Sequence, residues 1–127
     1  ETMIERKRII SSATASHARG VLEGVVSDGT GKLAAIEGEK IGGKTGTAQS
    51  YDPAIRRYSP TKFRASFIGF VSSIEPPIVI AVSVSEPKAS HFGGVVSAPL
   101  FKKIAEKTIK YLRAENAAAN DVSVEKK

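Results

Sequence analysis

Hydrophobic and polar positions recur with two different periods along this chain, and together they predict two helices separated by three strands. The segment RIISSATASHARGVLEGVVSDGTG carries apolar residues at helical spacing. Its apolar stripe consists of Ala15, Ala18, Val21, Leu22, Val25 and Val26. Ser11 or Ser12 caps the start of this predicted helix, and Asp28, Gly29 and Gly31 end it.

The run VSAPLFKKIAEKTIKYLRAEN predicts the second helix, with Ser97 as its cap and Pro99 in its first turn. The apolar face expected to meet the rest of the protein consists of Leu100, Ile104, Thr108 and Leu112. The lysine-rich remainder of this helix is interpreted as a solvated exterior. Residues 116–127, AAANDVSVEKK with the preceding Asn, are expected to form a disordered tail.

Between the helices, three segments have strand patterns: KIGGKTGTAQS, FRASFIGFVSS and PIVIAVSVSEP. SYDPAIRRYSPTK is expected to be a polar loop between the first two. Pro76 and Pro77 force a tight connection between the last two, which predicts an antiparallel pair. The expected fold class is α+β, an antiparallel β-sheet with helices packed against it and two open sheet edges.

Composition narrows the function classes. The chain has 127 residues, which allows one domain at most, and no cysteine, which excludes disulfides and thiolate metal sites. A net charge of +6 favours an anionic partner. Nucleic acid is not expected, because no aromatic residues interleave with the basic face of the last helix. No apolar run approaches the ~20 residues of a membrane helix, and the start ETMIERK is not a signal peptide.

The stretch GEKIGGKTGTAQS contains the candidate ligand-binding groups of the chain. In a strand, Lys44 and Gly46 point to one face, whereas Thr45 and Thr47 point to the other. A ligand that touches both sets must therefore lie along the edge of the strand. The glycines at 42, 43 and 46 weaken a strand, which is useful where another backbone must come close. The pattern predicts an edge strand that accepts an extended peptide, with an ammonium, hydroxyls and a free N–H at hand.

Two other interpretations of this stretch are weighed against that one. GEKIGGKT matches the phosphate-loop pattern letter for letter, but no strand precedes it and GTAQSYDP cannot start a helix, so a phosphate site is rejected. Lys-Thr-Gly is also a sequence of three common residues, and by itself fits an ordinary strand or turn.

The neighbouring blocks favour a specific family. GGKTGTAQ, ASFIGFV and SEPKASHFGGVVSAPLFKKIAEKTIKYL, with RIISSATASHARGVLEGVVSDGTGKLAAI upstream, resemble the C-terminal part of the transpeptidase domain of class B penicillin-binding proteins over about residues 8–113. The resemblance implies a partial penicillin-binding-protein or serine β-lactamase-like fold over residues 1–115. It implies that Lys44 lies beside the catalytic serines and that Lys44, Thr45 and Thr47 bind the substrate carboxylate. It further implies that Gly46 leaves room for the peptide and that the Thr47 backbone N–H forms half of an oxyanion hole.

The activity implied by the resemblance is cross-linking of peptidoglycan by acyl transfer from stem peptides that end in D-Ala-D-Ala, without cofactor or metal. Implied partners are these peptides, β-lactams, the missing N-terminal part of the transpeptidase domain, and other cell-wall synthesis or division proteins. The implied location is the outer face of the cytoplasmic membrane, through an anchor outside these residues. A non-catalytic peptide-binding module and a β-lactam sensor or β-lactamase of the same fold stay as alternatives.

The chain departs from the family pattern at the nucleophile. The signatures Ser-x-x-Lys and Ser-x-Asn precede Lys-Thr-Gly in these enzymes, and neither does so here. SPTK, from Ser59 to Lys62, lies after the motif and is interpreted as an exposed loop rather than a nucleophile. The chain alone is therefore expected to be inactive. His17 and His91 are too far apart in sequence to indicate a metal site, and Arg56 and Arg57 are expected in a solvated loop.

Overall fold

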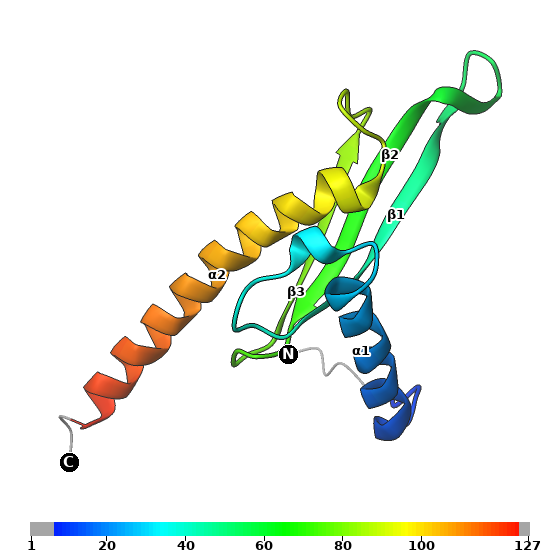
Figure 1. Cartoon of the computed structure of the whole chain (residues 1–127). Helices are drawn as coiled ribbons and strands as arrows, with labels where there is room; N and C mark the ends of the chain where they lie inside the picture. The colour runs from blue at the N-terminus through cyan, green and yellow to red at the C-terminus, as the bar shows by residue number, and fades with distance from the viewer. Residues whose placement is uncertain (1–6, 125–127) are drawn as a thin grey trace.

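A computed structural model describes residues 7–124, and within them the chain forms two α-helices, a short 3-10 helix and one sheet (Figure 1). The elements in chain order are α1 (Ser12–Ser27), η1 (Lys32–Ala34), β1 (Ile41–Asp52), β2 (Arg57–Val71), β3 (Ile78–Ser85) and α2 (Gly93–Val124). This is the α+β class that the hydrophobic pattern predicts.

The sheet is antiparallel, with strand order β1-β2-β3. Each strand pairs with its neighbour in sequence, because the connections after β1 and β2 are too short for any other arrangement. Strands β1 and β3 therefore form the two margins of the sheet within residues 7–124. The extended, marginal position predicted for residues 42–49 is confirmed.

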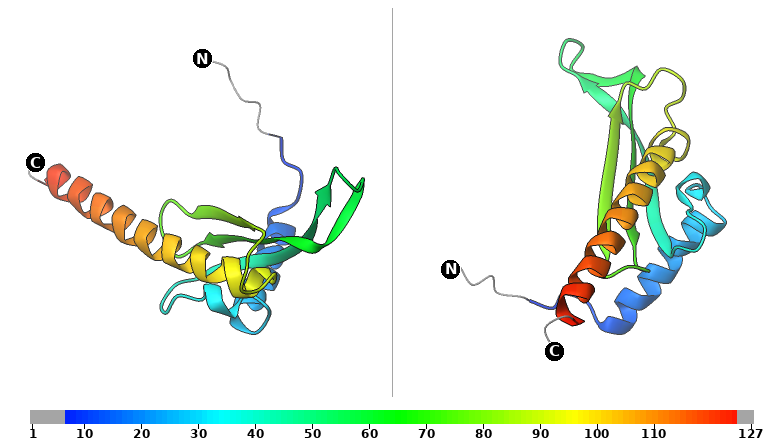
Figure 2. Two further views of the ribbon diagram at one scale, coloured as in Figure 1. Left: turned by 90° about the horizontal axis from the view of Figure 1, so that it is seen from above. Right: turned by 90° about the vertical axis from the view of Figure 1, so that its left-hand side faces the viewer.

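The hydrophobic core lies between the sheet and α2, which crosses one face of the sheet (Figures 1 and 2). Side chains alternate along β2, so that Phe67 and Val71 point towards this helix and are fully buried. The ring of Phe67 meets the ring of Phe101 edge to face, with centroids 4.9 Å apart. The short residues Ala98 and Ala105 let the helix backbone approach the sheet closely.

Helix α2 differs from its sequence prediction at both its start and its buried face. It begins at Gly93 rather than after a Ser97 cap, so that Ser97 and Pro99 lie inside the helix. The buried residues are Ser97, Ala98, Phe101, Ala105 and Ile109. Leu100 and Ile104, which were expected in the core, are 40% and 46% exposed, whereas Leu112 packs against the core as expected. The buried stripe thus combines two large side chains, Phe101 and Ile109, with short ones that let the helix lie close to the sheet.

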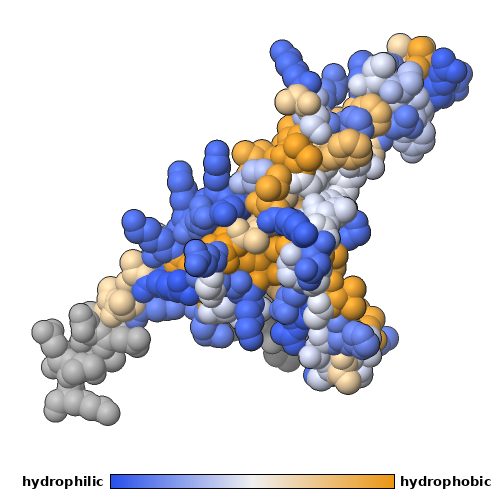
Figure 3. All heavy atoms as spheres, in the orientation of Figure 1, coloured by the Kyte–Doolittle hydropathy of each residue, from blue (hydrophilic) through white to orange (hydrophobic). Residues whose placement is uncertain are grey.

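The end of α2 also extends beyond its predicted limit. The helix continues to Val124, where the sequence was expected to become a disordered tail from residue 116. The run of alanines at 117–119 consists of the strongest helix-forming residue, which explains the continuation. Residues 125–127 of that predicted tail lie outside the described part of the chain. Figure 3 shows hydrophilic side chains over the middle of this helix.

The opposite face of the sheet is not covered by α2 or η1, which both lie on the core side (Figure 2). Ile68 of β2 and Val79 of β3 point outwards there and are 56% and 74% exposed. Lys44 lies across from Ile68 on the same face. Exposed apolar side chains therefore lie beside a lysine on this face of the sheet.

The connection between β1 and β2 is much shorter than the predicted loop of residues 50–62. The two strands continue through most of that segment, and only residues 53–56 remain as a turn. Tyr51 and Tyr58 face each other across the strands, with ring centroids 5.9 Å apart. Because β3 pairs with β2 only from Arg64 onwards, the β1–β2 hairpin projects beyond the sheet as a two-stranded ribbon (Figure 1).

Helix α1 begins and ends where the sequence predicts, and it packs against β1 and η1. The Ser11 hydroxyl accepts a hydrogen bond from the Thr14 N–H at 3.0 Å, which settles the choice of cap in favour of Ser11. Of its predicted apolar stripe, Val26 is buried in the core and Val21 is 61% exposed. The helix therefore anchors the chain through its last turn.

An ion pair fixes α2 relative to the start of β1. The guanidinium of Arg113 lies 2.8 Å and 3.1 Å from the two carboxylate oxygens of Glu39, whose side chain is only 7% exposed. The Ser73 hydroxyl donates to the same carboxylate at 2.6 Å and accepts from the Lys40 N–H at 3.1 Å. The cluster joins α2, the segment before β1 and the β2–β3 turn.

Replacing Arg113 with alanine is expected to lower the free energy of unfolding by about 2 kcal/mol, because the mostly buried Glu39 carboxylate loses its counter-charge. The double variant Glu39→Ala/Arg113→Ala should lose less than the sum of the single losses. Arg57→Ala, on the exposed hairpin, is the matched control and should leave stability within about 0.5 kcal/mol. Thermal unfolding followed by circular dichroism measures all four, and strict additivity would contradict the coupling.

Candidate functional site

The candidate site follows β1 from Lys44 to Thr47, at the margin of the sheet. Lys44 and Gly46 pair with Ile68 and Ser66 of β2, and the intervening threonines pair with the residues between. This register confirms the predicted alternation: Thr45 and Thr47 lie on the face that α2 covers, and Lys44 lies on the other. Lys44 and Thr47 are exposed, whereas Thr45 and Gly46 are half-buried.

The Lys44 ammonium bends around the margin of the sheet towards the next residue. Its Nζ lies 2.9 Å from the Thr45 carbonyl oxygen and 3.5 Å from the Thr45 hydroxyl oxygen. N–H and C=O groups of successive residues in an antiparallel edge strand alternate between the partner strand and the open side. A Thr45 carbonyl on the open side places the Thr47 N–H, two residues further on, on that side too. Cation, hydroxyl and amide thus converge on the open side of β1.

The two threonine hydroxyls already have partners from distant parts of the chain. The Thr45 Oγ1 lies 3.0 Å from the Oγ1 of Thr30, in the turn after α1. The Thr47 Oγ1 lies 3.4 Å from the N–H of Gly93, the first residue of α2. These contacts border a hollow of about 310 Å³. Its lining residues are Thr30, Lys32, Leu33, Thr45, Thr47, Phe92, Gly93, Gly94 and Val95.

The glycine pair at the start of α2 makes this arrangement possible. A Cβ atom on Gly93 would lie 2.2 Å from the Ser66 carbonyl oxygen and 2.5 Å from the Gly46 carbonyl oxygen. A Cβ atom on Gly94 would lie 2.2 Å from the Thr30 carbonyl oxygen. The helix start therefore rests directly on backbone atoms of β1, β2 and the α1–η1 turn, which is a contact that only glycine permits.

The glycines before Lys44 have a different role from the one expected. The space beside Gly42 is filled by the ring of Phe70, and that beside Gly43 by the ring of Phe67, at 2.2 Å and 2.5 Å from where a Cβ would lie. These glycines accommodate aromatic rings of the neighbouring strand rather than an incoming backbone. A Cβ on Gly43 would also lie 2.8 Å from the Ile68 carbonyl oxygen of β2, whereas a Cβ on Gly46 would meet the Ser66 hydroxyl oxygen at 2.5 Å.

An aromatic cluster stands next to the site and was not predicted as a unit. His91 stacks on Phe63 with ring centroids 4.5 Å apart, and its ring centroid lies 4.2 Å from that of Phe92. The sequence signal is the pair His91-Phe92 directly before Gly93-Gly94. His17 is exposed on α1, and residues 7–124 contain no group of three or more His, Cys, Asp or Glu that could hold a metal ion.

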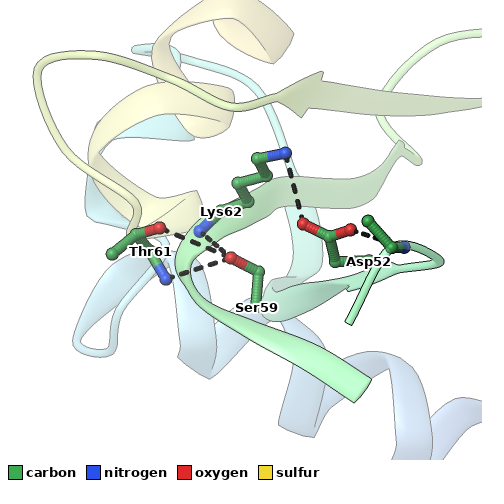
Figure 4. Close-up of polar contacts among 5 residues, drawn as sticks. Asp52, Ser59, Thr61 and Lys62 are labelled. Atoms are coloured by element: carbon green, nitrogen blue, oxygen red, sulfur yellow. Dashed lines mark hydrogen bonds and ion pairs between the residues drawn. The ribbon is translucent and has the colours of Figure 1, made fainter. Parts of the chain in front are cut away.

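Ser59 is not presented as a nucleophile (Figure 4). It lies within β2 rather than in an exposed loop, is 3% exposed, and accepts hydrogen bonds from the Thr61 and Lys62 N–H groups at 3.3 Å and 3.1 Å. The Lys62 ammonium points instead to the Asp52 carboxylate, 3.5 Å away. A buried hydroxyl that caps a local turn, without its lysine as a base, has no means of activation.

Two further serines precede a lysine by three positions, and sequence analysis did not use them. Ser85 is the exposed last residue of β3, and no hydrogen bond joins it to Lys88 in the described part of the chain. Ser123 precedes Lys126, and the side chains of that segment lie outside the described residues. Among the side chains that the structure describes, neither the Ser59 nor the Ser85 hydroxyl is hydrogen-bonded to the ammonium of the lysine three positions later.

An α+β unit with an edge strand that carries Lys-Thr-Gly-Thr, and a helix start resting on that strand, agrees with the resemblance to transpeptidase domains found in the sequence. The sequence model named Penicillin binding protein transpeptidase domain matches residues 2–106, so the chain belongs to this family. No helix among the described residues is both long enough and apolar enough to cross a membrane.

Among curated proteins, the chain is 41% identical over 105 residues to Stage V sporulation protein D of Bacillus subtilis, which covers 82% of this chain. It is 41% identical over 100 residues to the probable peptidoglycan D,D-transpeptidase PenA of Neisseria gonorrhoeae, which covers 77% of it. These relatives are class B penicillin-binding proteins. The chain spans only 16% and 17% of their respective lengths.

Solved structures agree with the fold. The transpeptidase domain of penicillin-binding protein 3 from Burkholderia pseudomallei, in its apo form, superposes with a TM-score of 0.71 at 45% identity, over 84% of this chain and 32% of that one. Penicillin-binding protein 3 from Mycobacterium tuberculosis in complex with aztreonam gives a TM-score of 0.72 at 32% identity, over 82% of this chain and 25% of that one. The predicted partial transpeptidase fold is confirmed.

Proposed function

We propose that this chain supplies the substrate-binding strand of a serine D,D-transpeptidase that cross-links peptidoglycan and is acylated by β-lactams. The observation that carries the proposal is the convergence of Lys44, Thr45 and the Thr47 N–H on the open margin of β1. The family, the relative named as a D,D-transpeptidase and the solved complex with aztreonam support it.

In this proposal each group has a distinct role towards a peptide that ends in D-Ala-D-Ala. The Lys44 ammonium and the threonine hydroxyls bind its terminal carboxylate through charge-assisted hydrogen bonds. The Thr47 N–H donates to the oxygen of the penultimate carbonyl as that oxygen becomes negative. Gly46 leaves space beside the peptide backbone, and β1 accepts the peptide as an added strand.

The reaction also needs a nucleophilic serine, which we place outside the residues of this chain. Its Oγ attacks the penultimate D-alanine carbonyl carbon and loses its proton to a neighbouring base. The carbon–nitrogen bond to the terminal D-alanine breaks, and the departing amine takes up a proton. The amine of a second stem peptide then attacks the ester and releases the serine. We therefore propose that the chain acts as part of a longer polypeptide, held outside the cytoplasmic membrane by an anchor elsewhere in it.

The experiment compares the 127-residue chain with the complete protein that contains it, using a fluorescent penicillin and gel electrophoresis under denaturing conditions. The complete protein should form a covalent adduct, and the chain alone should form none. Ser59→Ala in the complete protein should leave the acylation rate unchanged, since the Ser59 hydroxyl is buried and caps a turn.

Three other outcomes would contradict parts of the proposal, and mass spectrometry of the labelled peptide detects the first of them. An adduct on Ser59 or Ser85 would overturn the assignment of the nucleophile to residues outside this chain. A complete protein that binds D-Ala-D-Ala peptides but is never acylated would favour the alternative, a non-catalytic peptide-binding module. Rapid hydrolysis of the penicillin with release of free enzyme would favour a β-lactamase.

A further inference from the structure

Thr30 is a residue that the proposed site does not yet use, although its side chain contacts that site. It lies in the turn between α1 and η1, fifteen positions before Thr45 in sequence, and the two hydroxyl oxygens are 3.0 Å apart. Both threonines line the hollow of about 310 Å³ in front of α2. A contact between hydroxyls of separate elements is informative, because one of the two must donate its hydrogen to the other.

The turn that carries Thr30 is held on three sides. The Gly31 N–H donates to the Val25 carbonyl at 2.9 Å, which ties the turn to the end of α1. A Cβ on Gly31 would lie 3.2 Å from the buried ring of Phe67, and the Thr30 carbonyl lies against Gly94 of α2. The Thr30 hydroxyl is therefore positioned by the fold before any ligand arrives.

The direction of the hydrogen bond between the two threonines follows from what each group can donate. A threonine hydroxyl has one hydrogen and two lone pairs, and an ammonium only donates. The Lys44 Nζ, 3.5 Å away, therefore points a hydrogen at the Thr45 Oγ1. If Thr45 donated to Thr30, it would have no hydrogen for a ligand. If Thr30 donates, the Thr45 hydrogen is free to point into the hollow, and a carboxylate, which only accepts, selects this arrangement.

We propose that Thr30 is a positioning residue, which donates a hydrogen bond to the Thr45 Oγ1 and thereby directs the Thr45 hydroxyl hydrogen towards the carboxylate of the substrate or β-lactam. This inference rests on the proposed function of the site. Hydrogen bonds in a chain polarise one another, so the outer bond to the anion is strengthened by the inner one. Thr30 thus contributes to recognition of the carboxylate through Thr45.

The test uses the complete protein and two forms of one penicillin, the free carboxylate and its methyl ester. Thr30→Val keeps the shape of the side chain but removes the hydroxyl. It should lower the second-order rate constant of acylation by the free acid about tenfold, because the hydrogen bond from the Thr45 hydroxyl to the charged carboxylate is no longer directed by Thr30. The rate constant for the ester, which has no carboxylate, should stay within about twofold. Thr30→Ser should restore the acid rate.

The ratio of acid to ester rates is measured within each variant, so a partial loss of folded protein cancels. Thr108→Val is the matched control, because the Thr108 hydroxyl donates only to the Ile104 carbonyl of its own helix turn, and its ratio should equal that of the unmodified protein. An unchanged ratio in Thr30→Val, or an equal fall for acid and ester, would refute the positioning role. If the unmodified protein itself is not acylated, the proposed function fails instead.

Discussion

Replacing Lys44 with alanine in the complete protein is expected to lower the second-order rate constant of acylation by a fluorescent penicillin about 100- to 1,000-fold. The ammonium lies at the open margin of β1, and among the described residues its only hydrogen bonds are to Thr45. Removing it leaves the carboxylate without a counter-charge and the Thr45 hydroxyl without one of its donors. Because Lys44 is exposed, the fold should not suffer.

Lys40→Ala is the matched control for that experiment. Lys40 is an exposed lysine just before β1, and the fold uses its backbone rather than its ammonium. Its removal should leave the acylation rate within about twofold, although the change in net charge is identical. Melting temperatures of both variants should equal that of the unmodified protein. Near-normal acylation of Lys44→Ala would contradict the role assigned to this residue and, with it, the centre of the proposed site.

Gly93→Ala is expected to produce the largest loss of stability, about 3 kcal/mol, equivalent to a fall of roughly 10 °C or more in melting temperature. The added Cβ would meet the carbonyl oxygens of Ser66 and Gly46 at 2.2 Å and 2.5 Å, and backbone atoms in a sheet cannot move aside as a flexible side chain can. The start of α2 must therefore lift from β1, and the contact from the Gly93 N–H to Thr47 breaks with it.

Gly20→Ala provides a control whose expected effect on stability is the opposite, a gain instead of a loss. A Cβ on Gly20, in the middle of α1, would meet no atom within 4 Å. Alanine is the better helix former by about 0.5–1 kcal/mol, so this variant should be more stable than the unmodified protein. Thermal unfolding followed by circular dichroism measures both variants. Equal melting temperatures for Gly93→Ala and the unmodified protein would show that α2 does not rest on β1 as described.

The marginal position of β1 could be predicted from sequence because its signals are local. Glycines and alternating threonines identify a strand, and turn residues on either side limit its neighbours. The roles of Gly42 and Gly43 could not be derived in this way, because the rings that fill their spaces come from a strand more than twenty residues away. The sequence indicates that a side chain is missing and does not indicate what takes its place.

Helix α2 shows the same limit in its start and its orientation. Ser97 and Pro99 are strong local start signals, but contacts of Gly93 and Gly94 with distant backbone begin the helix earlier. Two apolar stripes compete along it, and the one with Leu100 and Ile104 was expected inside. Contact with the sheet decides the matter through the distance at which the backbones pack, a quantity that hydrophobicity alone does not contain.

The residues of the candidate site also differ in whether the sequence alone could identify them. Residues within one strand, Lys44 to Thr47, are adjacent in sequence and could be singled out together. Thr30 could not, because nothing in SDGTG distinguishes a threonine that ends a helix from one that supports a binding group. Its connection to Thr45 exists only after α1, the turn and β1 have packed together.

The hairpin that extends beyond β3 has a practical consequence for work on this protein. Its outer part consists of two strands only. The strand register shifts between Gln49 and Tyr51, so an irregularity in the pairing lies between Lys44 and the turn at residues 53–56. Exposed loop tips tolerate insertions well. A dye or an affinity peptide introduced between Pro53 and Arg56 is thus expected to report on, or capture, the protein without disturbing the strand from Lys44 to Thr47.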